Sequence, residues 1–103
     1  MGLAPLTCDP VISAVAQGHA EDMERRDYFS HTSLEGIDVF GRLASAGIAY
    51  MRASENIAYG CNSARSVVVL WMGSPRHRAN ILGDFTKVGV GAYDLYYVLV
   101  FVK

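Results

Sequence analysis

The segment from Tyr96 to Val102 constrains the fold most, because it is a strand-length run that is apolar on both faces. Successive side chains of a strand alternate between its two faces. One face therefore carries Tyr97, Leu99 and Phe101, and the other carries Tyr96, Val98, Val100 and Val102. A sheet with one face in water would alternate apolar with polar residues. Both faces are therefore expected to be covered by helices, which predicts a three-layer α-β-α domain.

A second strand is predicted just before this run, across a tight turn near Asp94 and Leu95. Here Val88, Val90 and Ala92 alternate with Gly89 and Gly91. Glycine inside a strand marks a place where another backbone must come close. The C-terminal residues therefore predict an antiparallel hairpin with a closely packed neighbour.

The first predicted helix begins at Asp9-Pro10, a capping acceptor followed by proline at the first helical position. It runs to about Arg26 and is amphipathic. Apolar residues and a histidine recur along it every four residues, at Val11, Val15, His19 and Met23, with Ile12, Ala16 and Ala20 beside them. Because His19 lies on this stripe, we expect a satisfied, partly buried histidine there.

Three shorter helices are predicted further along the chain. Asp38 caps one that presents Phe40, Leu43 and Ala44 and is stopped by Gly47. Ser63 caps the next, with Val67/Trp71 and Val68/Met72 as i,i+4 pairs before Gly73. Ser74-Pro75 opens a last helix that carries His77, and residues 55–59 form an extended segment ending at Gly60.

Composition excludes several classes of protein. The chain has 103 residues and a formal net charge of −1, so we expect one domain. Its charges look interspersed, which argues against a nucleic-acid surface or a polybasic membrane anchor. The longest apolar run, Val98 to Val102, is too short to span a bilayer. No signal peptide is visible, so the protein is either cytoplasmic or trimmed at its start.

Two cysteines, Cys8 and Cys61, lie far apart with no Cys-x-x-Cys spacing, so neither a zinc ribbon nor a redox motif is offered. Two interpretations stay open. The cysteines are either buried free thiols, as is typical of cysteine, or they form one disulfide in an oxidising compartment.

Three polar residues are candidates for a site. His77 lies in the first turn of a short helix, where backbone N–H groups are unpaired and a histidine tends to stay neutral. His31 lies in a polar loop, and Glu55 lies in the extended segment. Whether these three meet depends on the fold, because their spacing in sequence gives no support for a site.

The chain resembles the CAP superfamily of cysteine-rich secretory, antigen 5 and pathogenesis-related 1 proteins, and within it the bacterial, extracellular SCP-like branch. The resemblance covers nearly the whole chain and rests on six motifs in order. These are Gly2-Leu3-Ala4-Pro5-Leu6 with Asp9-Pro10, His19-Ala20-Glu21-Asp22-Met23, Phe29-Ser30-His31, Glu55-Asn56-Ile57-Ala58, Trp71 through Leu82, and Val88-Gly89-Val90-Gly91.

The resemblance implies an α+β fold, a three-layer α-β-α sandwich with a small, mainly antiparallel central sheet. It implies a single domain over residues 1–103 that lacks the family's first helix and signal peptide. It also implies an extracellular or cell-envelope location. A Cys8–Cys61 bridge gains only slight support, because cysteine positions vary across the bacterial branch.

The family carries a cleft with two histidines and up to two acidic residues, which binds a divalent metal such as zinc in some members. By resemblance, the histidines fall on His31 and His77 and the first glutamate on Glu55. The second glutamate of the eukaryotic pattern falls on Ser74, which removes one carboxylate. Arg76 stands where a glycine is expected and adds a cation beside the cleft.

Other residues near these motifs have simpler interpretations. Ser74 and Asn80 are candidates for polar groups of the cleft, although capping the helix is the simpler role for Ser74. Trp71, Tyr59 and Phe85 are more typical of a core than of a ligand platform.

Three functions fit this sequence. The first is a secreted binding or interaction domain whose cleft, lined by His31, Glu55 and His77, takes a small-molecule, lipid or protein ligand and can hold a divalent metal. The second is a metal-dependent hydrolase with zinc on the histidines and Glu55 as general base. The third is a carrier of sterols or other lipids. No complete catalytic set is recognisable, so the binding domain is the first hypothesis.

Overall fold

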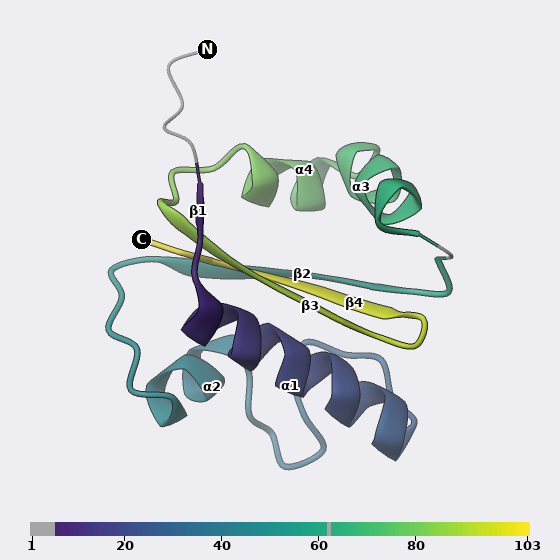
Figure 1. Ribbon diagram of the computed structural model, residues 1–103, viewed down its shortest axis with the longest axis horizontal. Helices are drawn as coiled ribbons and strands as arrows, with labels where there is room; N and C mark the ends of the chain where they lie inside the picture. Colours follow the sequence, from purple (N-terminus) through teal and green to yellow (C-terminus); the bar gives the residue numbers. More distant parts are fainter. Residues whose placement is uncertain (1–5, 62) are drawn as a thin grey trace.

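The computed structural model describes residues 6–61 and 63–103, and its helices cover both faces of a four-stranded sheet (Figure 1). Residues 2–5 of the first family motif lie outside the described residues. The elements in chain order are β1 (Thr7–Cys8), α1 (Pro10–Arg26), α2 (Val39–Ser45), β2 (Ala53–Tyr59), α3 (Ala64–Met72), α4 (Pro75–Ile81), β3 (Lys87–Tyr93) and β4 (Tyr96–Val102).

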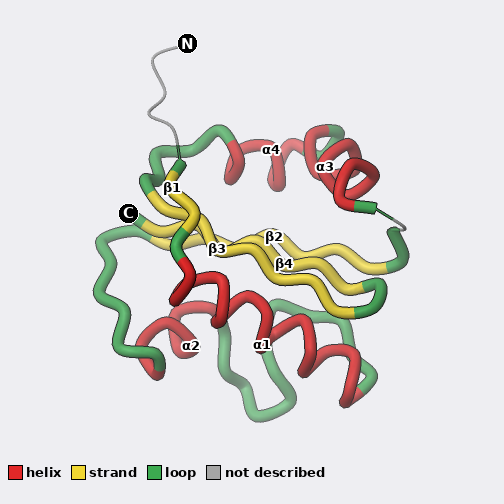
Figure 2. Tube along the Cα trace, in the orientation of Figure 1, coloured by secondary structure: helices red, strands yellow, loops and turns green. Residues whose placement is uncertain are grey.

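The sheet has the strand order β1-β3-β4-β2. The β3–β4 hairpin and the β2–β4 pair are antiparallel, and only the short β1 runs parallel to its neighbour β3. Helices α1 and α2 lie on one side of the sheet, and α3 and α4 lie on the other (Figure 2). The predicted α+β, three-layer sandwich with a mainly antiparallel sheet is confirmed.

The two faces of β4 belong to two different cores, as its alternating pattern predicts. One face, with Val98 and Val100 at its centre, packs in a cluster with α1 and α2. The other face places Tyr97 and Leu99 against Val67 and Trp71 of α3. The central strand therefore holds the three layers together.

Glycines in β3 allow α1 to approach the sheet at backbone distance. A Cβ built on Gly89 would lie 2.3 Å from the carbonyl carbon of Ile12, and one on Gly91 would lie 2.3 Å from the amide nitrogen of Gln17. Two α1 side chains also accept hydrogen bonds from β3: the Val90 N–H donates to Ser13 Oγ (3.0 Å) and the Ala92 N–H to Gln17 Oε1 (2.8 Å). Where β3 extends beyond its pairing with β1, its edge N–H groups at Val90 and Ala92 thus find hydrogen-bond acceptors on α1.

The predicted helix starts are confirmed at three positions. Asp9 accepts hydrogen bonds from the N–H groups of Val11 (2.8 Å) and Ile12 (3.1 Å). Asp38 accepts one from Gly41 and Ser63 accepts one from Ser66, both in the side-chain capping pattern.

Several expectations about burial were wrong. Val11 is 54% exposed, because the buried side of α1 runs through Ile12 and Ala16 rather than through Val11. Tyr59 is exposed at the end of β2, whereas Trp71 and Phe85 are buried as expected. Of the two interpretations of the cysteines, the Cys8–Cys61 disulfide is wrong, because both are free thiols. The burial expected of free thiols also fails for Cys8, which is exposed, while Cys61 is half-buried.

No helix within residues 6–61 or 63–103 has the length and apolar character needed to cross a membrane.

Candidate functional site

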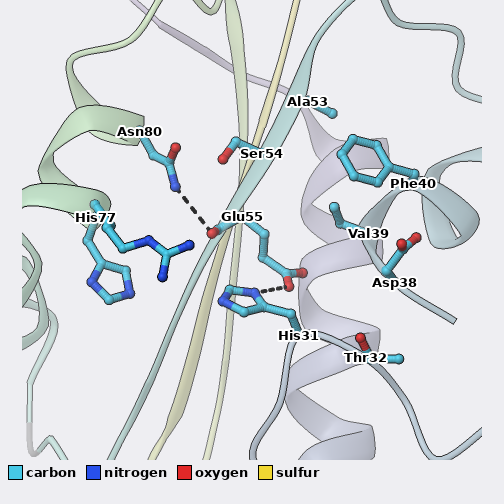
Figure 3. Close-up of a pocket in the computed structure, with 11 residues that line it drawn as sticks. His31, Thr32, Asp38, Val39, Phe40, Ala53, Ser54, Glu55, His77 and Asn80 are labelled. Atoms are coloured by element: carbon cyan, nitrogen blue, oxygen red, sulfur yellow. Dashed lines mark hydrogen bonds and ion pairs between the residues drawn. The ribbon is translucent and has the colours of Figure 1, made fainter. Parts of the chain in front are cut away.

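Four segments of the chain surround one open pocket of about 580 Å³ (Figure 3). They are the loop after α1, the start of α2, the first half of β2, and α4. The lining residues are His31, Thr32, Asp38, Val39, Phe40, Ala53, Ser54, Glu55, Arg76, His77 and Asn80. The fold therefore brings His31, Glu55, His77 and Asn80 to one hollow, although they come from distant parts of the sequence.

Glu55 lies at the base of this pocket, and both of its carboxylate oxygens are engaged. Its side chain is only 2% exposed. Oε1 lies 2.9 Å from His31 Nδ1, and Oε2 accepts a 2.6 Å hydrogen bond from Arg42 Nη2. A buried carboxylate is tolerated when it is paired and hydrogen-bonded in this way. Glu55 therefore holds the His31 ring in place from below.

Arg42 of α2 is a member of the site that the sequence did not reveal. Besides its bond to Glu55, it donates through Nη1 to the carbonyl oxygen of Ile37 (3.2 Å). Its Nε is buried and has no hydrogen-bond partner among the described residues. The only sequence signal was its place on a predicted helix, because nothing in the spacing pairs residue 42 with residue 55.

His77 faces the pocket from α4, and Ser74 holds its ring. The Nδ1 atom of His77 lies 3.0 Å from Ser74 Oγ, and the imidazole stacks beside the Trp71 indole with 6.4 Å between centroids. Burial, followed by the nearby charges of His31 and Arg76, lowers the pKa of His77. The expectation of a neutral histidine in this turn agrees with that direction.

The expected capping bond of Ser74 was wrong. Ser74 occupies the cap position before α4, but its side chain makes no hydrogen bond to the backbone N–H groups of that helix. Its hydroxyl pairs with the imidazole three residues later. Ser74 is also absent from the pocket lining, so it bears on the site only through His77.

Asn80 lines the pocket and also ties α4 to β2. Its Nδ2 donates to Asn56 Oδ1 (2.8 Å) and, at 3.4 Å, to the backbone carbonyl of Glu55, as Figure 3 shows for the latter. Asn56 is fully buried and donates in turn to the carbonyl oxygen of His77 (3.2 Å). These two amides fix the helix that carries His77 against the strand that carries Glu55.

His19 lies outside this pocket and has the structural role expected of it. It is 2% exposed, and its Nε2 lies 2.8 Å from the carbonyl oxygen of Ser30. Burial, with a contribution from the charge of Arg42, lowers its pKa. His19 thus fixes the loop that leads directly to His31.

The donor set does not fit a three-ligand metal site. The described residues include no group of three or more His, Cys, Asp or Glu side chains that could hold a metal ion together. Glu55 is buried with both oxygens already hydrogen-bonded, and each imidazole has its Nδ1 occupied, by Glu55 for His31 and by Ser74 for His77. Only the two Nε2 atoms remain as donors, so zinc on His31 and His77 stays a prediction.

Comparison with known proteins agrees with this architecture. The model of the cysteine-rich secretory protein family, CAP, matches residues 1–102. The chain belongs to the CAP family. An extracellular protein containing an SCP domain from Bacillus anthracis superposes with a TM-score of 0.95 at 35% identity, over 98% of this chain and 34% of that one.

Further relatives of this CAP domain come from other bacteria. An outer surface protein from Borrelia burgdorferi gives a TM-score of 0.87 at 25% identity, over 98% of this chain and 79% of that one. A cysteine-rich secretory protein from Staphylococcus aureus (TM-score 0.81, 24% identity, 98% and 32% covered) shows the fold alone.

Two curated proteins of Bacillus subtilis also match the CAP domain. The uncharacterized protein YkwD is 43% identical over 91 residues, 87% of this chain and 35% of that protein. The uncharacterized membrane protein YlbC is 39% identical over 103 residues, 99% of this chain and 30% of that protein. The chain therefore spans about a third of the length of these relatives.

Proposed function

We propose that this CAP domain is an extracellular binding domain and that the pocket between α4, β2 and α2 holds its ligand. The location is supported by structural neighbours described as extracellular or outer surface proteins. The observation that carries the proposal is the fixing of both imidazoles before any ligand arrives. Glu55, which is itself bonded to Arg42, holds His31, and Ser74 holds His77. Side chains fixed in advance lose little entropy on binding.

The ligand that suits this pocket is a small polar molecule or a polar protein segment. Eight of the eleven lining residues are polar or charged, and only Val39, Phe40 and Ala53 are apolar. Hydrogen-bonding groups around a preformed hollow give orientation and specificity to such ligands. A sterol needs a mainly apolar cavity, so this pocket does not favour the lipid-carrier alternative.

Binding suits the geometry better than hydrolysis. A general base must reach the water or hydroxyl that it deprotonates. The Glu55 side chain is only 2% exposed, and its oxygens are bonded to His31 and to Arg42, so a water molecule reaches it only if this buried group rearranges. The hydrolase alternative therefore requires a rearrangement that the binding domain does not.

Nuclear magnetic resonance titration tests the proposal. The probes are zinc chloride, inorganic phosphate and a pooled tripeptide library. We expect at least one probe to shift the His31, His77 and Asn80 signals saturably, and His77→Ala to abolish the effect. Leu34→Ala is the matched control, because Leu34 lies in the same loop as His31, is 63% exposed and is outside the pocket lining.

The other outcomes separate the alternatives. If no probe moves these signals, or if the shifts persist in His77→Ala, the pocket is not the binding site. Calorimetric titration with zinc tests whether the pocket binds a metal. Equal, negligible heat for the wild type, His31→Ala and His77→Ala would exclude zinc binding by these histidines. If the protein cleaves the peptide library, and if this cleavage is lost with a chelator and in Glu55→Gln, the hydrolase hypothesis is correct and the binding-domain hypothesis is wrong.

A further inference from the structure

Helix α3 exposes apolar side chains over most of its surface. Only Val67 and Trp71 are buried against the sheet. The other large side chains stand in solvent: Val68 is 48% exposed, Val69 68%, Leu70 54% and Met72 37%. A helix that is apolar on all sides is normally buried, and contiguous exposed apolar surface marks a contact site. The outer face of α3 is therefore suited to a partner.

The same layer of the molecule carries only positive charge. No Asp or Glu occurs from residue 56 to residue 83, whereas Arg65, Arg76 and Arg78 do. All three arginines are exposed, and none has an ion-pair partner within the described residues. The charges of the α3–α4 layer are therefore of one sign, whereas the α1–α2 layer mixes both signs, so the expected interspersed pattern fails for the α3–α4 layer.

Helical spacing places one of these charges among the apolar side chains. Arg65 is three, four and seven residues before Val68, Val69 and Met72, so the four share one side of α3. Helix α4, with the other two arginines, lies next to α3 on the same side of the sheet (Figure 1). Arg76 points into the pocket, whereas Arg78, two residues later on α4, points to another side of that helix. Apolar side chains with an arginine among them on the exposed side of a helix are typical of helices that lie on membranes.

We propose that the α3–α4 layer docks on the surface of an anionic lipid membrane. The apolar side chains of α3 enter the boundary between headgroups and acyl chains, and Arg65 and Arg78 contact lipid phosphates. A second copy of this chain suits the layer less well. Two of the three acidic residues on α1 are already paired within the chain, Glu21 with Arg25 (3.2 Å) and Asp22 with Arg26 (3.5 Å). Only Glu24, which has no ion-pair partner within the described residues, is left on this helix to receive another copy's arginines.

This proposal does not depend on the pocket. Arg76 lines the pocket, but Arg65 and Arg78 do not, and neither do the exposed residues of α3. Variants of Arg65, Arg78 and Val69 therefore test the membrane surface while leaving the pocket residues unchanged.

The test is co-sedimentation of the domain with vesicles of equal phosphatidylglycerol and phosphatidylcholine, compared with phosphatidylcholine alone. We expect binding to the mixed vesicles only, and weaker binding as salt is raised. Val69→Gln should weaken binding roughly fivefold by removing a buried apolar contact. Val11→Gln should leave it unchanged, since Val11 is a similarly exposed valine (54%) on the opposite layer. The double variant Arg65→Gln, Arg78→Gln should weaken it by at least tenfold and flatten the salt dependence.

Three outcomes overturn the proposal. These are no binding to the mixed vesicles, equal binding to neutral vesicles, or equal losses in Val69→Gln and Val11→Gln. Size-exclusion chromatography with light scattering tests the alternative that a second copy of the chain binds this layer. A dimer that Val69→Gln dissociates, with no vesicle binding, assigns the layer to a second copy instead. Unchanged thermal unfolding of each variant shows that a loss of binding is not a loss of fold.

Discussion

The two helical layers of this domain differ in how they contact the sheet. Helix α1 has 17 residues, of which Ile12, Ala16, His19, Ala20 and Met23 are buried, and it approaches β3 at backbone distance. Helix α3 buries only Val67 and Trp71, and α4 has no fully buried residue. Close packing is therefore concentrated on one side of the sheet. The other side holds α4 by polar bonds and leaves surface for contacts.

The pocket lies where these two layers meet across the end of β2. Its His31–Glu55–Arg42 group joins the loop after α1 to α2, and its Asn80–Asn56 pair joins α4 to the sheet. Changes in the α1 layer should therefore affect stability most. Changes at exposed positions of the α3–α4 layer should affect binding with little cost in stability.

The largest effect is expected at the contact between α1 and β3. Gly91→Ala should lower the free energy of unfolding by about 3 kcal/mol, the upper end of the range for overpacking, because the backbone of α1 cannot move aside as a side chain can. Chemical denaturation measures it. Gly18→Ala is the matched control: nothing lies within 4 Å of its Cβ, so replacing a helical glycine there should stabilise by about 0.5–1 kcal/mol. Equal effects at both positions would contradict the close contact.

The next largest effect is expected where α2 supports the pocket. Arg42→Met leaves Glu55 buried with only His31 beside it, so unfolding free energy should fall by about 2 kcal/mol, somewhat less than for a fully uncompensated charge. Adding Glu55→Gln removes that charge and should recover part of the loss. If the double variant is no more stable than Arg42→Met, the ion pair is not the cause.

Acidification should weaken the α1 side through His19. Its pKa is lowered in the folded protein by burial and by Arg42, from an ordinary value of 6.5. The unfolded chain then binds the proton more readily, so stability is full above about pH 6.5 and falls as the pH drops toward the folded pKa. Denaturation at a series of pH values checks this. His77, whose pKa is also lowered, contributes with the same sign, so His19→Gln should reduce the slope and His19→Gln, His77→Gln should reduce it further.

The smallest effect is expected on the outer face of α3. Val69→Gln should change the free energy of unfolding by less than about 0.5 kcal/mol, as is usual for an exposed position. Val67→Ala in the same helix removes buried contacts and should cost roughly 2 kcal/mol. A large loss of unfolding free energy in Val69→Gln would show that this face of α3 is part of the core.

Much of the fold was predictable because its signals are local. The two-faced pattern of β4 predicted three layers, and Asp9, Asp38 and Ser63 marked the helix starts. Gly89 and Gly91 predicted a close neighbour. Each of these depends on residues a few positions apart, where backbone geometry and capping act directly.

The site was predictable only in part. The resemblance pointed to His31, Glu55 and His77, and Asn80 was a further candidate for a polar group of the cleft; the fold brings these four to one pocket. It did not point to Arg42, which takes one oxygen of Glu55, or to the use of the Ser74 hydroxyl on His77. Those contacts depend on where α2 sits against β2 and on one rotamer choice in α4, and neither has a signal in the spacing of residues.

The sequence by itself determined the kinds and order of the elements, since alternation along β4 and the caps of the helices are properties of short segments. Only the packing of the helices on the sheet settled which side of α1 is buried, which partners hold Glu55, and that α3 and α4 lie together on one side of the sheet. The reason is physical: burial and ion pairing depend on distances between elements, and those are set when the helices pack on the sheet.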